Sequence, residues 1–386
     1  MAEVEIGIGK SGRRAYGLDD IAIVPSRRTR DPDDIDVSWE IDAYQFGLPV
    51  LASAMDGVVS PRIAIELGRL GGLGVLNLEG LWTRYEDPDP VYQEIAGLAD
   101  DEATKRMQEL YAQPINPELI GRRVEEIKRA GVVTAASLTP QRVARSHAHA
   151  LEAGLDILVI QGTVVSAEHV SVTTEPLNLK TFIARYDLPV IVGGCASYAT
   201  ALHLMRTGAA GVLVGVGPGA ACTTRGVLGI GVPQATALAD AAGARTRHLE
   251  ETGRYVQVIA DGGMRTGGVV AKAIACGAVA VMLGSPLARA VEAPGRGYHW
   301  GMATFHPDLP RGTRVRTRTL GTLKEILLGP APVNDGSMNL FGALRTSMAT
   351  CGYASVKEFQ KAEVMVAPAL QTEGKGLQRS QGVGMG

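Results

Sequence analysis

Eight short apolar runs, separated by stretches of helical length, constrain the fold of this chain more than any other feature. The runs are rich in Val, Ile, Leu and Ala and lack alternation of polar and apolar residues, which is typical of parallel strands buried on both faces. A strand followed by a helix, repeated eight times, predicts a closed (β/α)8 TIM barrel. An open doubly wound sheet is the alternative, but the count of eight favours closure. The runs occupy residues 48–56, 73–79, 131–138, 155–161, 188–194, 210–217, 256–263 and 278–285.

Polar residues and glycines cluster directly after these runs. In a closed barrel the carboxyl ends of all the strands meet at one rim, where the chemistry of such folds takes place. We therefore expect one mouth to be surrounded by Asp56, Asn77, Gln161, Gly194, Gly217, Asp261 and Ser285.

Two long segments interrupt the repeat. Residues 86–130 contain two predicted helices, at 103–111 and 117–129, and residues 291–340 are rich in Pro, Gly and Arg. A segment of the second kind beside the rim is a mobile flap or a surface excursion. We expect residues 1–386 to form one barrel domain with this flap and a flexible C-terminal tail.

Charge and cysteine content exclude several classes of protein. The formal net charge is −2, which gives no electrostatic footprint for nucleic-acid binding. The four cysteines form no CxxC pair, and the histidines show no metal-ligand spacing. No apolar run approaches the ~20 residues of a membrane span, and the N-terminus does not resemble a signal peptide. We expect a cytoplasmic protein that binds neither nucleic acid nor membranes.

The segment VGVGPGAACTTRG (214–226) carries the strongest candidate for chemistry. Three glycines follow a strand and allow backbone groups to converge on an ion or a phosphate. Cys222 lies at the open end of this segment, beside Thr223, Thr224 and Arg225. A cysteine near a cation and exposed amides is activated as a nucleophile. A small cysteine packed in a turn is the alternative, and the residues alone leave both open.

Two further strand ends indicate a phosphate site. ADGGMRTGG (260–268) and LGSP (283–286) each end a run in glycines and open a helix, and consecutive late strands of a barrel commonly offer amides to a phosphate. Asp261 can accept hydrogen bonds from a ribose diol, although a turn or N-cap aspartate is the alternative. In SAMD (53–56), Ser53 could bond a ligand and Met55 could pack on a base, or the segment is an ordinary turn.

Over nearly its whole length the chain resembles the IMP dehydrogenase/GMP reductase family, in particular its short branch that lacks the paired CBS module. The segment between 86 and 130 is too short to hold that module. The motifs that carry the resemblance occur in the expected order, and they are YGLDDIAIVPSRRT, LASAMDGVV, GVGPGAACTTRGVLGIGVPQ, ADGGMRTGG, GYHWGM, GTLKEILLGP and LFGALRTSM.

The resemblance implies covalent catalysis on a purine nucleotide. In a dehydrogenase, the Cys222 thiolate adds to C2 of IMP, hydride leaves to NAD⁺, and water releases XMP. In a reductase, the cysteine displaces ammonia from GMP, and NADPH returns the hydride to give IMP. Thr224 would help to activate water or ammonia in either reaction. The family also implies homotetramers, sometimes paired as octamers.

The resemblance also implies binding roles for the residues that match the family's motifs. Carbonyls of Gly217, Gly219 and Cys222 would hold a monovalent cation, usually K⁺, and Glu373 would contribute to a second such site from a neighbouring subunit. Asp261 matches the ribose ligand. The remaining matches are phosphate ligands at Gly263, Gly284 and Ser285, residues beside the nucleotide at Ser53 and Met55, and backbone contacts to the base at Gly301 and Met302.

Several positions depart from the family pattern. The long flap of dehydrogenases carries an Arg-Tyr pair whose arginine activates water, and no such dipeptide occurs in the flap of this chain at 291–340. Arg314 is the substitute base that we consider, while Arg311 falls near the residue that reads the base edge. His299 falls near a tyrosine that binds phosphate. Cofactor-facing positions hold Gln161 in place of an aspartate and Gly194 in place of an asparagine. Because of these changes, and of Ala220 at a phosphate-binding serine, a weakly active nucleotide-binding regulator is a third hypothesis.

Overall fold

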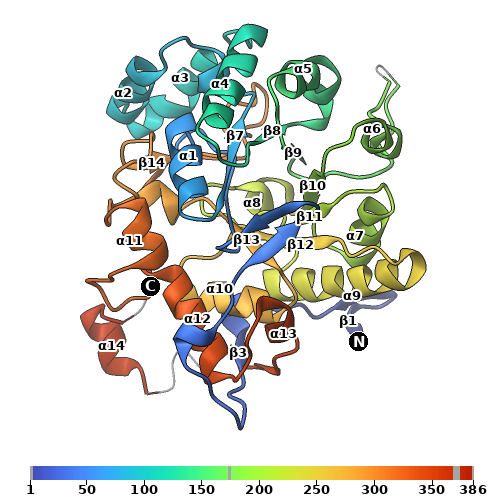
Figure 1. Ribbon diagram of the computed structural model, residues 1–386, viewed down its shortest axis with the longest axis vertical. Coiled ribbons are helices and arrows are strands. Elements are labelled where there is room, and N and C mark those ends of the chain that lie inside the picture. The colour runs from blue at the N-terminus through green and yellow to red at the C-terminus, as the bar shows by residue number, and fades with distance from the viewer. Residues whose placement is uncertain (1–2, 173–174, 368–373, 385–386) are drawn as a thin grey trace.

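A closed barrel of eight parallel strands forms the centre of the computed structural model, which describes residues 3–172, 175–367 and 374–384 (Figure 1). Strand β13 pairs with β6 and closes the cylinder, with Leu283 opposite Ala52. The prediction of a (β/α)8 barrel is therefore confirmed, and the open sheet is wrong. The strands in barrel order are β6 (Val50–Ala52), β7 (Leu73–Asn77), β8 (Ala135–Leu138), β9 (Ile157–Gln161), β10 (Val190–Cys195), β11 (Gly211–Val214), β12 (Gln257–Asp261) and β13 (Ala280–Leu283).

Helices surround the barrel, one after each strand (Figure 1). Several begin at a side chain that caps free backbone amides, as Ser60 does for Ile63 N and Thr266 for Val269 N. The helices of this ring are α1 (Pro61–Arg69), α4 (Pro117–Arg129), α5 (Pro140–Glu152), α6 (Leu179–Arg185), α7 (Tyr198–Met205), α9 (Gln234–Thr252), α10 (Gly267–Ala275) and α12 (Leu340–Thr350).

The strand side chains divide the core into two layers. Leu51, Val75 and Ile259 point into the barrel interior, whereas their neighbours Val50 and Leu76 pack between strands and helices. Because both faces are buried, the strands need no polar alternation. The hairpin of β4 (Trp39–Ile41) and β5 (Tyr44–Phe46) contributes to the interior cluster and covers the end of the barrel opposite the strand carboxyl ends.

Glycine at position 74 allows α1 to lie directly on β7. A Cβ atom at Gly74 would lie 2.4 Å from Ala64 Cα and 2.7 Å from Ala64 Cβ. We expect Gly74→Ala to destabilise the protein by about 1–3 kcal/mol, because this helix cannot approach the strand without displacement. The midpoint of urea unfolding measures the effect. Gly268→Ala in α10 is the matched control, since nothing lies within 4 Å of the new methyl group; equal losses in both variants would contradict the packing argument.

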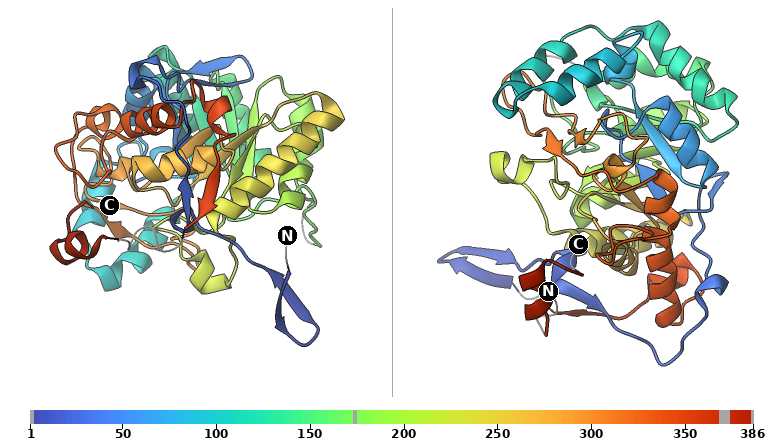
Figure 2. Two further views of the ribbon diagram at one scale, coloured as in Figure 1. Left: turned by 90° about the horizontal axis from the view of Figure 1, so that it is seen from below. Right: turned by 90° about the vertical axis from the view of Figure 1, so that its left-hand side faces the viewer.

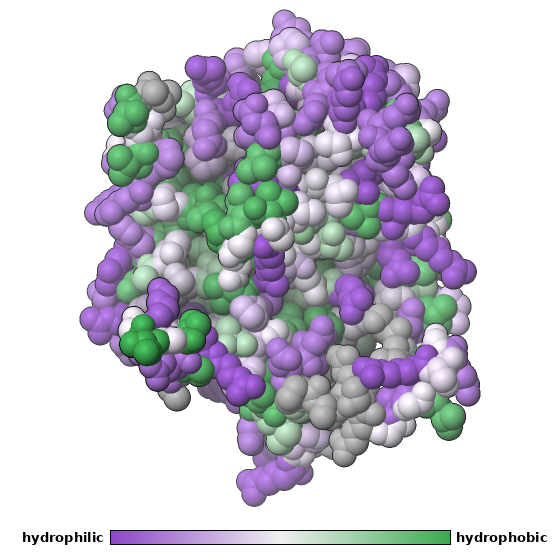
Figure 3. Space-filling model, turned by 180° about the vertical axis from the view of Figure 1, so that it is seen from behind, coloured by the Kyte–Doolittle hydropathy of each residue, from purple (hydrophilic) through white to green (hydrophobic). Residues whose placement is uncertain are grey.

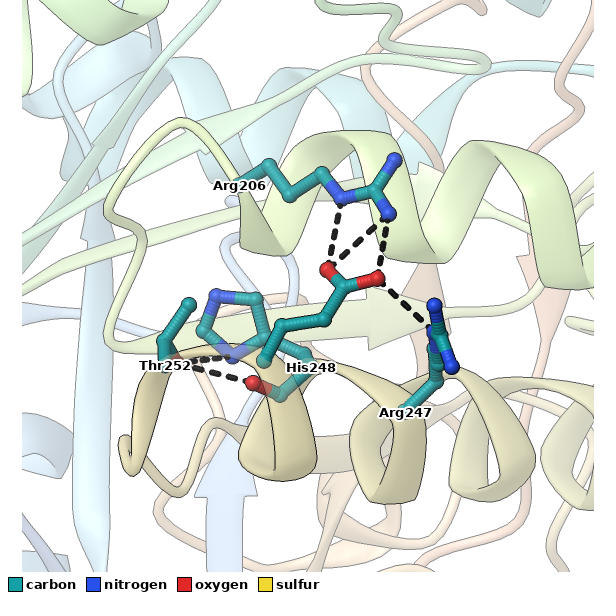
Figure 4. A network of polar contacts seen from close by, with 5 residues as sticks. Arg206, Arg247, His248 and Thr252 are labelled. Carbon is teal, nitrogen blue, oxygen red and sulfur yellow. Dashed lines mark hydrogen bonds and ion pairs between the residues drawn. The ribbon is translucent and has the colours of Figure 1, made fainter.

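Polar contacts join neighbouring helices at the surface. The Glu251 carboxylate accepts hydrogen bonds from Arg206, which follows α7, at 2.8–3.0 Å, and from Arg247 of α9 at 2.8 Å (Figure 4). The hydrogen bond from Arg206 is the main reason that the pKa of Glu251 lies below its usual value. A second group in the same view is the Thr252 hydroxyl, which donates to the His248 carbonyl at 2.8 Å.

The two predicted interruptions are ordered additions to the barrel. The first contains α2 (Asp89–Gly97) and α3 (Asp100–Tyr111) ahead of α4, so the sequence interpretation missed α2 and began the next helix three residues late. The flap contains β14 (Tyr298–His299), β15 (Val315–Arg316) and α11 (Leu323–Leu328). Flap and insertion lie side by side in Figures 1 and 2, and they share an apolar cluster that includes Tyr92, Tyr111 and Trp300.

The chain ends add small elements outside the barrel. The hairpin of β1 (Glu3–Gly7) and β2 (Lys10–Arg13) projects from the body (Figure 2). Strand β3 (Ile21–Ile23) pairs with β16 (Val364–Val366) from the other end of the chain. Helix α13 (Val356–Phe359) precedes β16, and α14 (Gly376–Gln381) follows it. Helix α14 lies in the segment that we expected to be a flexible tail. Seen from behind, the surface carries apolar side chains in and around a recessed area, with polar residues at its edges (Figure 3). Among the described residues, no helix is long and apolar enough to cross a membrane.

Candidate active site

A cavity of about 1140 Å³ opens at the carboxyl ends of the barrel strands. Segments after β6, β9, β11, β12 and β13 line it, together with the flap. Fifteen of the residues singled out from the sequence surround this one space, and they are Ser53, Met55, Gln161, Gly217, Gly219, Cys222, Thr224, Asp261, Gly263, Gly284, Ser285, His299, Gly301, Met302 and Arg311. The barrel topology brings these distant segments together because every strand ends at the same rim.

Cys222 lies in the loop after β11, two residues before the five-residue helix α8 (Thr224–Leu228) begins. Its backbone NH donates to the Gly219 carbonyl at 3.0 Å, and its Sγ lies 3.2 Å from Thr224 Oγ1. Cys222 is half-buried and lines the cavity, whereas Cys195 and Cys351 belong to the core. Burial raises the pKa of Cys195 to about 12, so that thiol remains protonated. The geometry favours the nucleophile over the packed-cysteine alternative for Cys222.

The flap holds the loop of Cys222 by short strand-like pairing. Thr223 N donates to the Arg311 carbonyl at 3.1 Å, and Thr313 N donates to the Ala221 carbonyl at 3.0 Å. Cys222 and Gly312 therefore face each other as an antiparallel bridge. Arg311 lines the cavity and forms no ion pair among the described residues. A positive charge is thus available to a ligand there.

Asp261 ends β12 and extends into the cavity. Its Oδ2 accepts a hydrogen bond from Gln161 Nε2 at 3.1 Å, and burial raises its pKa to about 7 despite that bond. Gln161 Oε1 is buried without a partner among the described residues. The two side chains form a pair whose remaining polar atoms are available to hydroxyl groups of a ligand.

Glycines beside Asp261 give the cavity room for an anion. Gly262 and Gly263 have φ values of 77° and 82°, which L residues rarely adopt, and a Cβ at Gly263 would lie 3.0 Å from Pro218 Cβ. Ser285 Oγ lies 2.7 Å from His299 Nε2. Burial lowers the pKa of His299 to about 4, so its ring is neutral at physiological pH and can donate one hydrogen bond.

Two predicted site residues lie elsewhere. Gly194 does not line the cavity, since its backbone is buried in hydrogen bonds with Gly162 and Val165. Arg314, predicted as the water-activating base, is also absent from the cavity wall: its guanidinium binds the Ile95 and Leu98 carbonyls and the carboxylate of Asp100 instead. Glu373 lies outside the described residues.

Asp56 is buried and does not line the cavity. Its carboxylate accepts hydrogen bonds from the Tyr111 hydroxyl and from Leu81 N, the latter at 3.1 Å, and Trp300 Nε1 donates to the Tyr111 oxygen at 2.7 Å. Burial raises the pKa of Asp56 to about 6. Asn77, on the neighbouring strand, is buried beside it. These two residues, predicted at the rim, are therefore packed between the barrel, the insertion and the flap, outside the cavity wall.

Sequence reasoning missed part of the cavity wall. Arg265 lines it, and so do two rim segments, 139–141 after β8 and 162–164 after β9. For these two segments, the signal in the sequence was their position directly after a strand, but their side chains do not indicate a particular chemistry. Tyr111 and Trp300 were missed because they come from the insertion and the flap, and their meeting depends on tertiary packing.

The fold and the cavity define a (β/α)8-barrel protein that presents a large ligand site at the strand carboxyl ends, where barrel enzymes bind their substrates. The sequence model of the "IMP dehydrogenase / GMP reductase domain" matches residues 15–305. The chain belongs to the IMP dehydrogenase/GMP reductase family and is an oxidoreductase of that family. Its described residues include no paired CBS module, so it resembles the short branch, as predicted.

Relatives agree with this assignment. An uncharacterized oxidoreductase of Mycolicibacterium smegmatis is 51% identical over 373 residues, covering 94% of this chain and 99% of the relative. The inosine-5′-monophosphate dehydrogenase of Methanocaldococcus jannaschii is 28% identical, with 94% of each chain covered. A crystal structure of an IMP dehydrogenase/GMP reductase-like protein from Corynebacterium glutamicum superposes with a TM-score of 0.90 at 47% identity, covering 94% of this chain and 97% of the other.

Proposed function

We propose that the protein is an IMP dehydrogenase, which converts IMP, NAD⁺ and water to XMP, NADH and a proton through a covalent bond to Cys222. The observation that carries the proposal is the half-buried thiol, 3.2 Å from the Thr224 hydroxyl, in a cavity that two glycine-rich strand ends also line. A matched relative bears the name of an IMP dehydrogenase.

The proposed reaction has two halves. The Cys222 thiolate adds to C2 of the purine, and the C2 hydride leaves to the nicotinamide, which is the chemistry that the cofactor supplies. Water then attacks the thioimidate at C2, and the C–S bond breaks to return the thiolate and release XMP. Thr224 Oγ1, next to the sulfur, is placed to move a proton of that water.

Nucleotide binding uses Asp261 and the glycine-rich strand ends beside it. Asp261 accepts hydrogen bonds from the ribose diol, and the backbone at Gly263, Gly284 and Ser285 receives the phosphate. His299 donates to the same phosphate through its neutral ring or through Ser285. The remaining proposed contacts are Ser53 and Met55 beside the nucleotide, Gly301, Met302 and Arg311 at the base, and Gln161 toward the cofactor.

We infer that a monovalent cation binds the loop before Cys222, as the family resemblance implies. The carbonyls of Gly217, Gly219 and Cys222 are neutral oxygen donors of the kind that bind K⁺, and the φ of 76° at Gly217 lets the backbone turn. The Gly219 carbonyl already accepts from Cys222 N but keeps a second lone pair. The cation would fix the loop conformation around the nucleophile. A homotetramer or octamer remains a prediction from the resemblance.

GMP reductase is the second candidate, and one observation favours it. Arg314 is held by other partners, so it does not replace the water-activating base of long-flap dehydrogenases. A reductase that converts GMP, NADPH and a proton to IMP, NADP⁺ and ammonia needs no such base.

Two parallel incubations distinguish these functions. The protein with K⁺ is mixed with IMP and NAD⁺, or with GMP and NADPH, and absorbance at 340 nm is followed while mass spectrometry locates adducts. A rise with an adduct on Cys222 supports the dehydrogenase, and a fall that depends on GMP supports the reductase. Binding of nucleotide without turnover under either condition overturns both and supports the regulator.

Thr224→Val is expected to slow release of the covalent intermediate more than its formation. The variant keeps the shape of the side chain but loses a hydroxyl that is fully buried beside the sulfur. Loss of one neutral hydrogen bond of about 1 kcal/mol corresponds to roughly fivefold. Rapid-quench kinetics measure both steps, with Thr224→Ser as the control that retains the hydroxyl; unchanged release in the valine variant would contradict the assigned role.

A further inference from the structure

Arg314 links the flap to the α2–α3 insertion by hydrogen bonds to three residues of that insertion. Its guanidinium donates to the Ile95 carbonyl, to the Leu98 carbonyl at 2.9 Å and to the Asp100 carboxylate at 2.6 Å. Its side chain is only 3% exposed, whereas that of Asp100 is 89% exposed. The arginine therefore satisfies free carbonyls at the C-terminal end of α2, where a cation is electrostatically favoured.

The anchored arginine lies within a wider contact between flap and insertion. Its guanidinium carbon lies 4.3 Å from the centre of the Tyr298 ring. Phe305 stacks on Tyr111 with ring centres 4.0 Å apart, and Gln108 Nε2 donates to the His306 carbonyl at 3.0 Å. Residues before and after the turn of the flap loop are thus held by the insertion that contains helices α2 and α3.

The same stretch of flap reaches the nucleophile one residue away from Arg314. Thr313 N donates to the Ala221 carbonyl, and the Arg311 carbonyl accepts from Thr223 N, which brackets Cys222 between two hydrogen bonds. A shift of the 311–314 segment would therefore move the Cys222 backbone and the Sγ–Thr224 contact with it. A displacement of about 1 Å at a reacting atom can cost on the order of 10²-fold in rate.

We propose that Arg314 is a positioning residue and that the α2–α3 insertion is the platform on which the flap sets the position of Cys222. This role replaces the catalytic base predicted from the sequence. The proposal rests on Cys222 being the nucleophile of the proposed function, but the anchoring itself does not depend on which purine is the substrate.

The test compares Arg314→Met and Arg314→Lys with Arg316→Met. Arg316 is a matched control because it lies on the same hairpin and also contacts Tyr298, through that residue's hydroxyl at 2.8 Å, but it binds no carbonyl of α2. For each variant, hydrogen exchange is measured in peptides covering 221–223 and 311–313, and the rate of Cys222 alkylation by iodoacetamide is measured by mass spectrometry. Turnover with IMP and NAD⁺, or with GMP and NADPH, completes the comparison.

We expect Arg314→Met to accelerate exchange in both peptides, to change the alkylation rate of Cys222 and to lower kcat by about tenfold with little change in KM. Arg314→Lys should recover part of the loss, since an ammonium can bind some of the same acceptors. Arg316→Met should behave like the parent protein. Parent-like exchange at 221–223 and parent-like kcat in a folded Arg314→Met variant would overturn the proposal.

The role of Arg314 is still tested if the Arg314→Met variant does not fold or if no nucleotide is turned over. If Arg314→Met does not fold, Asp100→Asn weakens the same anchor from its exposed side and should shift exchange at 311–313 in the same direction; no shift there would overturn the proposal. If no purine nucleotide is turned over, the proposed function fails, while exchange and alkylation still decide whether Arg314 positions the Cys222 loop.

Discussion

Cys222→Ala is expected to abolish the nucleotide adduct and to lower turnover by on the order of 10⁴-fold or more, because covalent catalysis loses its only nucleophile. The structure explains why no other thiol can take over. Cys195 and Cys351 are buried in the core, and burial raises the pKa of Cys276 to about 11. Mass spectrometry of the protein after incubation with each nucleotide and its cofactor measures the adduct.

Cys276→Ala is the matched control for this experiment. It removes a thiol that packs against the core near Lys272 and should leave adduct formation unchanged. Calorimetry with the Cys222→Ala variant should still detect nucleotide binding, since the proposed phosphate and ribose contacts remain. An adduct that persists in Cys222→Ala would show that the nucleophile is wrong.

Asp261→Ala is expected to weaken nucleotide binding by on the order of 10²- to 10⁴-fold, because two hydrogen bonds from a diol to a carboxylate contribute about 1.5–3 kcal/mol each. Binding should also depend on pH. Burial raises the pKa of this carboxyl to about 7, so the protein binds the proton more tightly when folded and the charged acceptor is lost as pH falls through 7. Calorimetric affinities at pH 8 and pH 6 are therefore expected to differ, with the weaker value at pH 6.

A nucleotide without the ribose diol isolates this contact. A 2′,3′-dideoxy nucleotide should bind the parent protein weakly and should lose nothing further in Asp261→Ala, which is the behaviour of a closed double-mutant cycle. The titration of the nucleotide phosphate affects binding to the parent protein and to Asp261→Ala equally, so comparing the two proteins at each pH cancels its effect. Without ligand, the Asp261→Ala protein should be no less stable to unfolding than the parent protein above pH 7, because burial disfavours the charged Asp261 carboxylate in the folded state. If removal of the ribose hydroxyls and the Asp261→Ala substitution each weakened binding by the same factor whether or not the other change was present, the assigned contact would be contradicted.

The sequence predicted the architecture well because its signals are local. Each barrel strand reads as a short apolar run, and the structure confirms all eight, with ends that differ by a few residues. Helix α2 was missed because its residues 89–97 contain Pro90 and Gly97, which weaken the helical pattern, and the helix is held by packing on the flap. Such a helix depends on tertiary contacts more than on intrinsic propensity.

The residues around the cavity show the same division. Cys222, Asp261 and Ser285 lie at or after strand ends, and the order of strands alone brings them to one rim. Arg314 and Gly194 could not be placed in this way. Arg314 lies in a flap whose direction is set by carbonyls of α2, more than 200 residues away in the sequence, with separations of 216 and 219. Gly194 lies within β10, and its backbone forms hydrogen bonds with Gly162 and Val165 of the loop after β9.

The sequence by itself determined the barrel, the order of its strands and the presence of a cysteine at the strand carboxyl ends, because hydrophobic period and strand–loop boundaries are encoded within short windows. Only the tertiary structure decided that Arg314 anchors the flap to the insertion, that Asp56 is buried against Tyr111, and that Asp261 pairs with Gln161. These outcomes depend on where long side chains from distant segments find buried partners, and burial and hydrogen bonding between such segments leave no periodic trace in the sequence.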